Sequence, residues 1–506
     1  MGERFLVYQK KGRRKRMYYP TLEELKRLEK DKGNLVPIYR DIAADMDTPV
    51  SAYLKINRGG YSFLLESVEG AERLARYSFI GTDPYRVLIT RNEDNVNPLP
   101  LLAAELNQYR LVPIPNLPRF CGGAVGYLSY EVAAYFEALP SPANDPLGLP
   151  ESTFMFTDTI LVFDHVTHKI RVLSHVRLNG DDIERSYTEA VDKIETLVAR
   201  LKQPLPEARA QPSHHITGSR CVSSNFTEEQ FEACVTKAKE YIASGEVIQV
   251  VLSQRFTRPT NAKPFEIYRA LRSLNPSPYM FFLDFQDFHL LGASPEILVR
   301  VENGTVMTRP LAGTRPRGKD PTEDIRLEQE LRTDEKERAE HIMLVDLGRN
   351  DIGRVSEPGT VVIDRLMEVE RYSHVMHLVT HVQGKLRHDL TPFHALEACF
   401  PAGTVAGAPK VRAMEIIAEL EPDKRGPYAG AVGYFSFSGN MDMAITIRSM
   451  VVKDGVAHVQ AGCGVVYDSV PEREFAETIN KAKALLEAID VAEQAQGEMD
   501  TSDTAY

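Results

Sequence analysis

The sequence of 506 residues contains no tryptophan and few cysteines. The five cysteines are scattered and show no spacing typical of metal ligands: Cys121, Cys221, Cys234, Cys399 and Cys463. This pattern argues against a cysteine metal site and indicates reduced thiols. No apolar run approaches the roughly 18 residues that a membrane span needs, and no apolar signal core stands near the start. We therefore expect a cytoplasmic protein without a membrane partner.

The charge of the chain does not favour nucleic-acid binding. The formal net charge is −11, which promotes solubility and weakens association with another polyanion. A single basic run, Lys10-Lys11-Gly12-Arg13-Arg14-Lys15-Arg16, has no aromatic residues among its cations. A solvated segment explains it more simply than a nucleic-acid interface does. An anionic small substrate stays possible, because the local field at a site need not follow the total charge.

The composition, 43% hydrophobic and 26% charged, is typical of a globular protein. A chain of this length is expected to form two or more domains, or one large elaborated domain. Residues 202–225 contain several prolines and serines and predict a linker. It would separate an N-terminal domain over residues 1–201 from a second domain over 226–490. Residues 491–506 are polar and are expected to form a disordered tail.

Local signals favour an α+β fold with large antiparallel sheets. Thr227 and Gln230 form a capping box before an amphipathic helix. Asn303-Gly304 and Asp454-Gly455 each separate two strand-like segments and predict hairpins. A short repeat links residues 123–130 (GAVGYLSY) with 430–437 (GAVGYFSF) and indicates two related sheets.

Two pairs of glutamates share one design: Glu337 with Glu340, and Glu474 with Glu477. Each pair has i,i+3 spacing in a helical stretch, so its carboxylates lie on one stripe, roughly 4.5 Å apart along the axis. Four converging carboxylates suit a hard divalent cation such as Mg²⁺. Either pair alone is more simply a solvated helix face. Only the surrounding sequence favours a metal site.

Six segments resemble one family in order along the chain. They are Gly292–Glu296, Ala312–Gly318, Glu337–Asp351, Ser373–Leu378, Gly403–Lys410 and Gly462–Ser469. The family is the chorismate-utilising enzymes, and the similarity is greatest to the large aminase subunits that form anthranilate. The motifs cover about residues 225–490, and Leu64–Ser67 with Ala75–Gly81 extend the resemblance to the N-terminal part. It implies antiparallel sheets in a sandwich-like core surrounded by helices.

The resemblance implies a reaction. Chorismate and ammonia would give 2-amino-2-deoxyisochorismate, which would lose pyruvate to leave anthranilate, the first step of tryptophan biosynthesis. Mg²⁺ held by the four glutamates would grip the ring carboxylate. Glu296 matches the general acid for the departing hydroxyl, His377 the group for pyruvate elimination, and Thr404 a hydroxyl beside the substrate.

Further residues match substrate-binding positions of the family: Gly313, Thr314, Tyr428, Arg448, Gly462, Gly464 and Lys481. Arg448 and Tyr428 would hold the enolpyruvyl carboxylate, helped by backbone N–H groups around the glycines. Lys481 is equally well explained as a salt-bridge partner on its helix.

Two positions separate this chain from its relatives. Gln249 stands where isochorismate and salicylate synthases carry a lysine that activates water. Ala312 stands where aminodeoxychorismate synthases commonly carry a nucleophilic lysine. Both favour direct attack by ammonia. No glutaminase is visible in the sequence, so ammonia is expected to be free or supplied by a separate glutamine amidotransferase subunit. The alternatives are an aminodeoxychorismate synthase component of the folate pathway and a non-catalytic tryptophan-binding regulator.

The resemblance also implies feedback inhibition by L-tryptophan at a second site. The residues concerned are Glu66, Ser67, Asn275, Pro278, Tyr279, Met280, Gly433 and Tyr434. Glu66 would take the ammonium group, Ser67 a hydrogen bond, and Tyr279 and Met280 the indole face. Without the resemblance, ordinary strand and core packing would explain these residues better.

Overall fold

The computed structural model describes residues 18–28, 33–68, 76–178, 182–206, 221–372 and 375–503. The basic run at residues 10–16, most of the predicted linker, the pair Ser373-His374 and the last three residues lie outside this range. Among the described residues, no helix combines the length and apolar character that crossing a bilayer requires.

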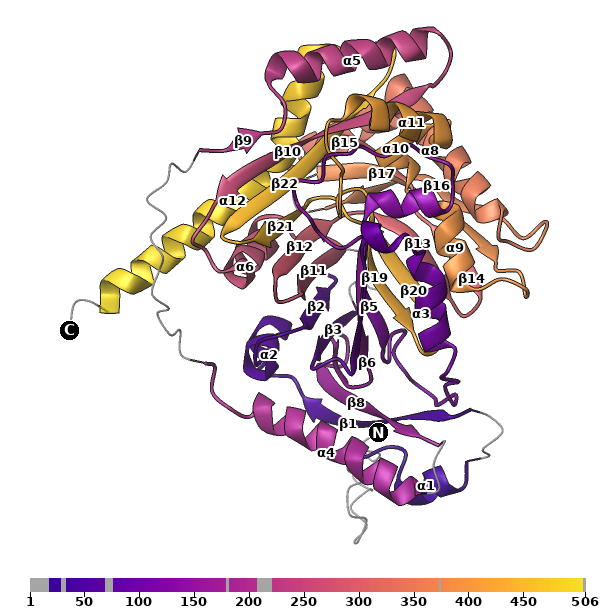
Figure 1. Cartoon of the computed structure of the whole chain (residues 1–506), viewed down its shortest axis with the longest axis vertical. Helices are drawn as coiled ribbons and strands as arrows, with labels where there is room; N and C mark the ends of the chain where they lie inside the picture. The colour runs from indigo at the N-terminus through magenta and orange to yellow at the C-terminus, as the bar shows by residue number, and fades with distance from the viewer. Residues whose placement is uncertain are drawn as a thin grey trace, which may run out of the picture.

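The described strands form two antiparallel sheets (Figure 1). The first sheet has the order β1 (Leu35–Ala43), β8 (Lys169–Arg177), β7 (Ile160–Asp164), β3 (Tyr77–Thr82), β2 (Ser62–Glu66), β11 (Tyr279–Asp284), β12 (Phe288–Ser294), β21 (Ser449–Lys453), β22 (Val456–Val465), β10 (Gln249–Pro259) and β18 (Gly407–Ala408), with β9 (Ser223–Ser224) paired to β10. The second has the order β15 (Leu311–Pro316), β17 (Val375–Lys385), β14 (Thr305–Thr308), β13 (Ile297–Glu302), β20 (Met441–Ile445), β19 (Ala431–Ser436), β5 (Gly123–Leu128), β6 (Ser152–Thr157) and β4 (Arg86–Thr90), with β16 (Val362–Arg371) paired to β17.

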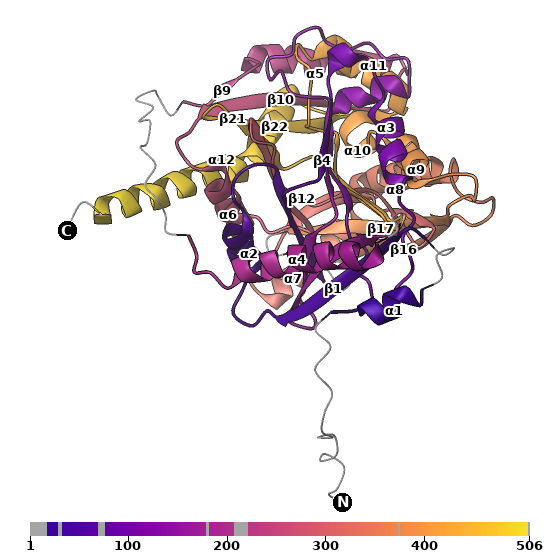
Figure 2. The same ribbon diagram turned by 60° about the horizontal axis from the view of Figure 1, so that its bottom comes forward.

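Helices surround these sheets. They are α1 (Leu22–Lys26), α2 (Pro49–Ile56), α3 (Pro98–Leu106), α4 (Ile183–Leu201), α5 (Glu228–Ala243), α6 (Pro264–Leu274), α7 (Pro321–Thr333), α8 (Glu335–Gly353), α9 (Pro392–Cys399), α10 (Gly403–Ala406), α11 (Lys410–Leu420) and α12 (Pro471–Asp503), with short 3-10 turns at Asn92–Asp94 and Tyr130–Tyr135. Figure 2 shows α4 lying across the end of the first sheet that contains β1 and β8.

One hydrophobic cluster lies between the two sheets. It joins Phe79 and Phe281 of the first sheet to Val125 and Tyr434 of the second. Two larger clusters cover the outer faces, where α6 and α12 pack on the first sheet and α3 and α9 on the second. The α+β prediction with a sandwich-like core surrounded by helices is therefore confirmed.

Both halves of the chain contribute to both sheets. Strand β2 of the N-terminal half pairs with β11 of the C-terminal half, and β5 pairs with β19. The two sheets therefore continue across the division expected at residues 202–225.

The prediction of a disordered tail over residues 491–506 is wrong in its described part. Helix α12 continues to Asp503. Ala492 is buried, and the carboxylates of Asp490 and Glu493 accept hydrogen bonds from Arg258 at 2.6 and 3.1 Å. Because the Arg258 side chain is only 4% exposed, its charge requires partners, and the helix supplies them.

The predictions that depend on only a few neighbouring residues are confirmed. Thr227 and Gln230 form the predicted capping box of α5. The two predicted hairpins join β13 to β14 and β21 to β22, with Asn303 and Asp454 at positive φ. The interpretation of the repeat as a sign of two related sheets is wrong, because β5 and β19 are adjacent strands of one sheet, with Gly126 opposite Gly433. A Cβ at either glycine would lie within 2.1 Å of a backbone oxygen, so close approach explains the shared glycines.

Candidate active site

The two glutamate pairs lie on different helices and are half-buried. Glu337 and Glu340 are on α8, and Glu474 and Glu477 are on α12. All four carboxylates have side-chain partners: the side chains of Ser469 and Cys463 lie close enough to Glu474 to lower its pKa. Arg315 donates to Glu337 at 3.1 Å, Gln249 to Glu340 at 3.1 Å, and Lys481 lies 2.6 Å from Glu477.

The chemistry of these carboxylates fits a hard divalent cation. Burial raises the pKa of both Glu337 and Glu474, and in each case the paired glutamate raises it further. A bound cation would relieve this repulsion. No three His, Cys, Asp or Glu side chains among the described residues stand close enough to form a ready-made metal cage. The donors therefore fit a cation that is also bound through water or substrate oxygens.

Glu296 is a buried carboxyl group between β12 and β13. Burial raises its pKa to about 8, so it is largely protonated at neutral pH. The hydroxyl of Thr404 is buried without a hydrogen bond of good geometry among the described residues. It nevertheless lies close enough to Glu296 to lower the pKa of that carboxyl group, as Arg309 does electrostatically. A cavity of ≈ 30 Å³ adjoins both side chains.

The imidazole of His377 on β17 is oriented through its Nδ1 atom. Its Nδ1 lies 2.9 Å from the Gly313 carbonyl oxygen and 3.1 Å from the Thr314 hydroxyl. A carbonyl only accepts hydrogen bonds, so Nδ1 carries the proton and Nε2 retains a lone pair. Burial lowers the pKa of His377, and the nearby Arg448 lowers it further. The imidazole is therefore neutral and able to accept a proton.

Arg448, Lys481 and Gly462 are joined by hydrogen bonds. Arg448 donates to the Lys481 carbonyl at 2.8 Å, and the Lys481 ammonium donates to the Gly462 carbonyl at 2.9 Å. A Cβ on Gly462 would lie 2.7 Å from the Tyr428 hydroxyl oxygen. The ammonium of Lys481 is thus shared by Glu477 and Gly462, which supports its interpretation as a salt-bridge partner.

Two further sets of contacts link these site residues. Gly313 contacts both His377 and Glu337, since a Cβ on Gly313 would lie 3.2 Å from Glu337 Oε2. Gln249, which binds Glu340, lies against Gly464, where a Cβ would be 2.7 Å from its Nε2. These contacts thus link predicted metal, catalytic and substrate-binding residues from separate elements, with Glu337 and Glu340 on α8, His377 on β17, and Gly313 and Gly464 on β15 and β22.

The sequence alone assigned no role to two arginines that contact these segments, Arg315 and Arg425. Arg315 lies inside the Ala312–Gly318 segment, but its contact with Glu337 becomes apparent only in the folded structure. Arg425 is fully buried and has no local sequence signal. Its guanidinium donates to the carbonyl oxygens of Val405 (2.8 Å) and Val251 (2.6 Å) and to Glu421. It also lies 5.8 Å from the ring centre of Tyr428.

A second cavity lies between the two sheets. It is lined by most of the predicted feedback residues, namely Glu66, Ser67, Pro278, Tyr279, Met280, Gly433 and Tyr434. Asn275 does not line it. The Ser67 hydroxyl is buried, and the described residues offer it no hydrogen-bond partner. The Glu66 carboxylate, by contrast, accepts hydrogen bonds from Tyr268 (2.6 Å) and Arg272 (3.0 Å), so it is already paired.

Comparisons with known proteins agree with this geometry. The family model of the chorismate binding enzymes matches residues 60–487. The chain is 51% identical over 492 residues to anthranilate synthase component 1 of Acetivibrio thermocellus, covering 94% of this chain and 99% of that protein. It is 48% identical over 497 residues to the component 1 of Aquifex aeolicus, with the same coverage.

Solved structures show the same fold. Anthranilate synthase component I of Streptococcus pneumoniae superimposes with a TM-score of 0.74 at 39% identity, covering 88% of this chain and 99% of that one. The menaquinone-specific isochorismate synthase of Escherichia coli superimposes with a TM-score of 0.67 at 21% identity, covering 92% and 98%, which shows the fold alone. The chain therefore belongs to the anthranilate synthase component I family of chorismate-binding enzymes.

Proposed function

We propose that this chain uses Mg²⁺ to convert chorismate and ammonia to anthranilate and pyruvate by way of 2-amino-2-deoxyisochorismate. The observation that carries the proposal is Glu296, a buried carboxyl group with a pKa of about 8 beside the hydroxyl of Thr404. A carboxyl group that is protonated at neutral pH can donate its proton to a departing hydroxyl. Ordinary carboxylates lack that proton.

Glu337, Glu340, Glu474 and Glu477 would hold the metal ion. When bound, the ion supplies a Lewis acid for the ring carboxylate of the substrate. Further residues of the chain would bind the two carboxylates of the substrate. Arg448 and Tyr428 would hold the enolpyruvyl carboxylate, and the backbone at Gly313 and Thr314 would position the ring carboxylate.

In the first step, ammonia would attack ring carbon C2 while Glu296 protonates the leaving 4-hydroxyl group, which departs as water. In the second step, Nε2 of His377 would take the proton from C2, and the enolpyruvyl group would leave as pyruvate once it gains a proton. The hydrogen bond from Nδ1 to Gly313 holds the ring so that Nε2 is free for this transfer.

Ammonia is the expected nucleophile because no base for water is present at the matching position. Gln249 is a neutral amide, and its Nε2 is already bonded to Glu340. Ala312 cannot form the covalent bond expected of an aminodeoxychorismate synthase. We propose that a glutamine amidotransferase subunit supplies the ammonia, in keeping with the "component 1" of the relatives' names.

We further propose that L-tryptophan binds the cavity between the sheets and inhibits the enzyme. Ser67 offers a buried hydroxyl that has no partner within the described part of the chain, and Tyr279, Met280 and Tyr434 offer an aromatic and thioether surface. Because Glu66 is held by Tyr268 and Arg272, the ammonium group would have to share that carboxylate with Arg272.

The central test is anthranilate formation by the purified chain. With chorismate, ammonium and Mg²⁺ it should form anthranilate and pyruvate, and with glutamine in place of ammonium it should form neither. Glu340→Gln and Glu477→Gln should each lower turnover about 100-fold or more, while Glu335→Gln, exposed on the same helix as Glu340, should not. Anthranilate fluorescence measures the rate. Full activity in EDTA, or an aminodeoxychorismate product, would contradict the proposal.

The role of His377 separates the two steps. His377→Met should slow pyruvate elimination about 100-fold or more and let 2-amino-2-deoxyisochorismate accumulate, because Glu296 is unchanged. Chromatography of the quenched reaction measures the intermediate. His381→Met, on the same strand, is the matched control. A His377→Met enzyme that consumes no chorismate would place the imidazole in the first step instead.

The pKa of Glu296 predicts the pH dependence. The carboxyl group must be protonated to act as an acid, so kcat/KM expressed per free ammonia should fall as pH rises through about 8. Thr404 lowers that pKa, so Thr404→Val should move the falling limb to higher pH. A profile that stays flat to well above this pH, or a limb that Thr404→Val moves to lower pH, would remove Glu296 from this role.

Inhibition by tryptophan tests the second cavity. Ser67→Phe should fill the cavity and raise the tryptophan concentration for half-inhibition about tenfold or more, with uninhibited turnover largely intact. Ser273→Phe, which adds the same ring at an exposed position on α6, is the control. Wild-type turnover that is insensitive to millimolar tryptophan would refute the site.

A further inference from the structure

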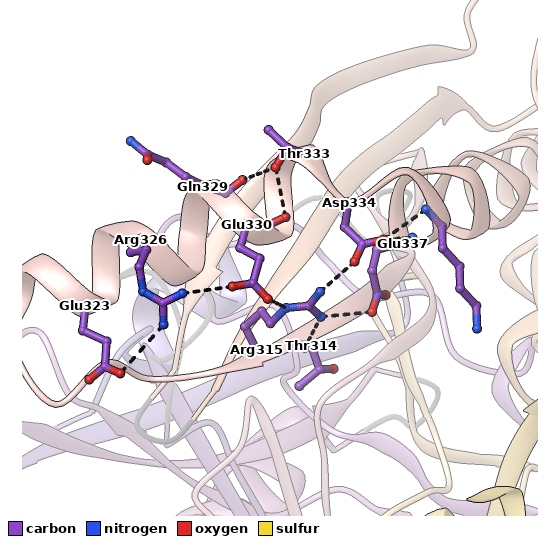
Figure 3. Close-up of polar contacts among 10 residues, drawn as sticks. Thr314, Arg315, Glu323, Arg326, Gln329, Glu330, Thr333, Asp334 and Glu337 are labelled. Atoms are coloured by element: carbon purple, nitrogen blue, oxygen red, sulfur yellow. Dashed lines mark hydrogen bonds and ion pairs between the residues drawn. The ribbon is translucent and has the colours of Figure 1, made fainter.

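The guanidinium of Arg315 is shared by three carboxylates (Figure 3). It lies 3.2 Å from Glu330 at the end of α7, 2.8 Å from Asp334 between the helices, and 3.1 Å from Glu337 on α8. The Arg315 side chain is 18% exposed, so solvent screens these contacts less than an ordinary surface ion pair. Arg315 thus connects β15 to both helices.

The start of α8 fixes this guanidinium. Asp334 is the N-cap of α8: its Oδ1 accepts from the backbone N–H groups of Lys336 and Glu337 at 3.0 and 3.1 Å. Its other oxygen, Oδ2, accepts from Arg315 Nη2. Arg315 Nη1 also donates to the Thr314 carbonyl at 3.0 Å. The cap and the strand backbone therefore hold the fork of Arg315 in one orientation.

Only one oxygen of Glu337 is used by Arg315. Nη1 binds Oε1, while Oε2 lies against Gly313, where a Cβ would be 3.2 Å away. Gly313 has φ +66 and is in hydrogen-bond contact with His377. The carboxylate is thus turned so that its second oxygen points toward the Gly313–Thr314 part of β15, which we propose for substrate binding.

We infer that Arg315 is a positioning residue that aims Glu337 at the metal ion, binding Oε1 and leaving Oε2 for coordination. The inference rests on the proposed Mg²⁺ site. Carboxylates that bind metals are commonly oriented by a hydrogen-bonding partner behind them, and loss of such a partner typically weakens metal binding about 10- to 100-fold. Gln249 holds Oε1 of Glu340 in the same manner.

The opposite role for Arg315 predicts the opposite sign. If Arg315 only competed with the metal ion for Glu337, replacing Arg315 would release Oε1 of Glu337 and remove a positive charge from the site. Mg²⁺ would then bind more tightly. If Arg315 aims Glu337, its removal weakens binding despite the added negative charge. The direction of the change in Mg²⁺ affinity therefore distinguishes the two roles.

The experiment is calorimetric titration of the full-length, chelator-treated chain with Mg²⁺ alone. Arg315→Met should raise the Kd about tenfold or more. Arg315→Lys should also raise it, because an ammonium keeps the charge but cannot present the planar fork. The control is Arg326→Met. Arg326 lies 3.2 Å from Glu330, which also binds Arg315, but it forms no ion pair or hydrogen bond with Glu337 (Figure 3). The Arg326 side chain is 62% exposed.

Each outcome decides the inference. A higher Kd in both Arg315 variants, with an unchanged Kd in Arg326→Met, supports it. An unchanged or lower Kd in Arg315→Met, or wild-type affinity in Arg315→Lys, overturns it while the Mg²⁺ site stands. A wild-type chain that binds no Mg²⁺ refutes the metal site itself. Thermal unfolding of the metal-free variants checks the fold, and if Arg315→Met is unfolded, Arg315→Lys decides.

Discussion

The fully buried guanidinium of Arg425 is the constraint on which the active site depends. A charge without access to water is costly unless it is paired and hydrogen-bonded, and here Glu421 and two backbone carbonyls accept four hydrogen bonds from the guanidinium. Those carbonyls belong to Val405, next to the proposed substrate hydroxyl of Thr404, and to Val251, two residues from Gln249. Tyr428 packs beside the same guanidinium. One cation thus fixes the relative positions of three segments that no continuous element connects.

Local physics made part of this molecule predictable. The hairpin turns need only a residue that tolerates positive φ followed by glycine, as at Asn303 and Asp454, and a capping box needs four consecutive residues. The site residues themselves came from resemblance, because i,i+3 glutamates are common on solvated helices. The features that were not predicted depend on contacts between residues far apart in the chain. Arg258 binds the carboxylates of Asp490 and Glu493 on α12, and Arg315 binds carboxylates of α7 and α8. The periodicity of hydrophobic residues along the sequence does not identify ion pairs of this kind.

The proposed inhibitor cavity and the acid Glu296 are connected by strand β20. Asp442 and Ala444 line the cavity, and the next residue, Ile445, donates its N–H to the Glu296 carbonyl at 3.1 Å. Strand β12 makes a second connection, since it runs from the hairpin with β11 to Ser294, just before Glu296. Because close-packed interiors transmit small displacements, a ligand that moves β20 alters the position of the acid. This gives the two sites a physical route of communication.

The pairing of β5 with β19 has a consequence for synthesis of the protein. Strand β5 is buried along its whole length, yet one of its two neighbours lies about 300 residues later in the chain. At about 5–20 residues per second, the ribosome takes tens of seconds to reach that neighbour. During this interval the nascent chain carries an apolar strand with an open edge, the feature that promotes aggregation. The long sequence separation of this pair therefore prolongs the exposure of an apolar strand edge during synthesis.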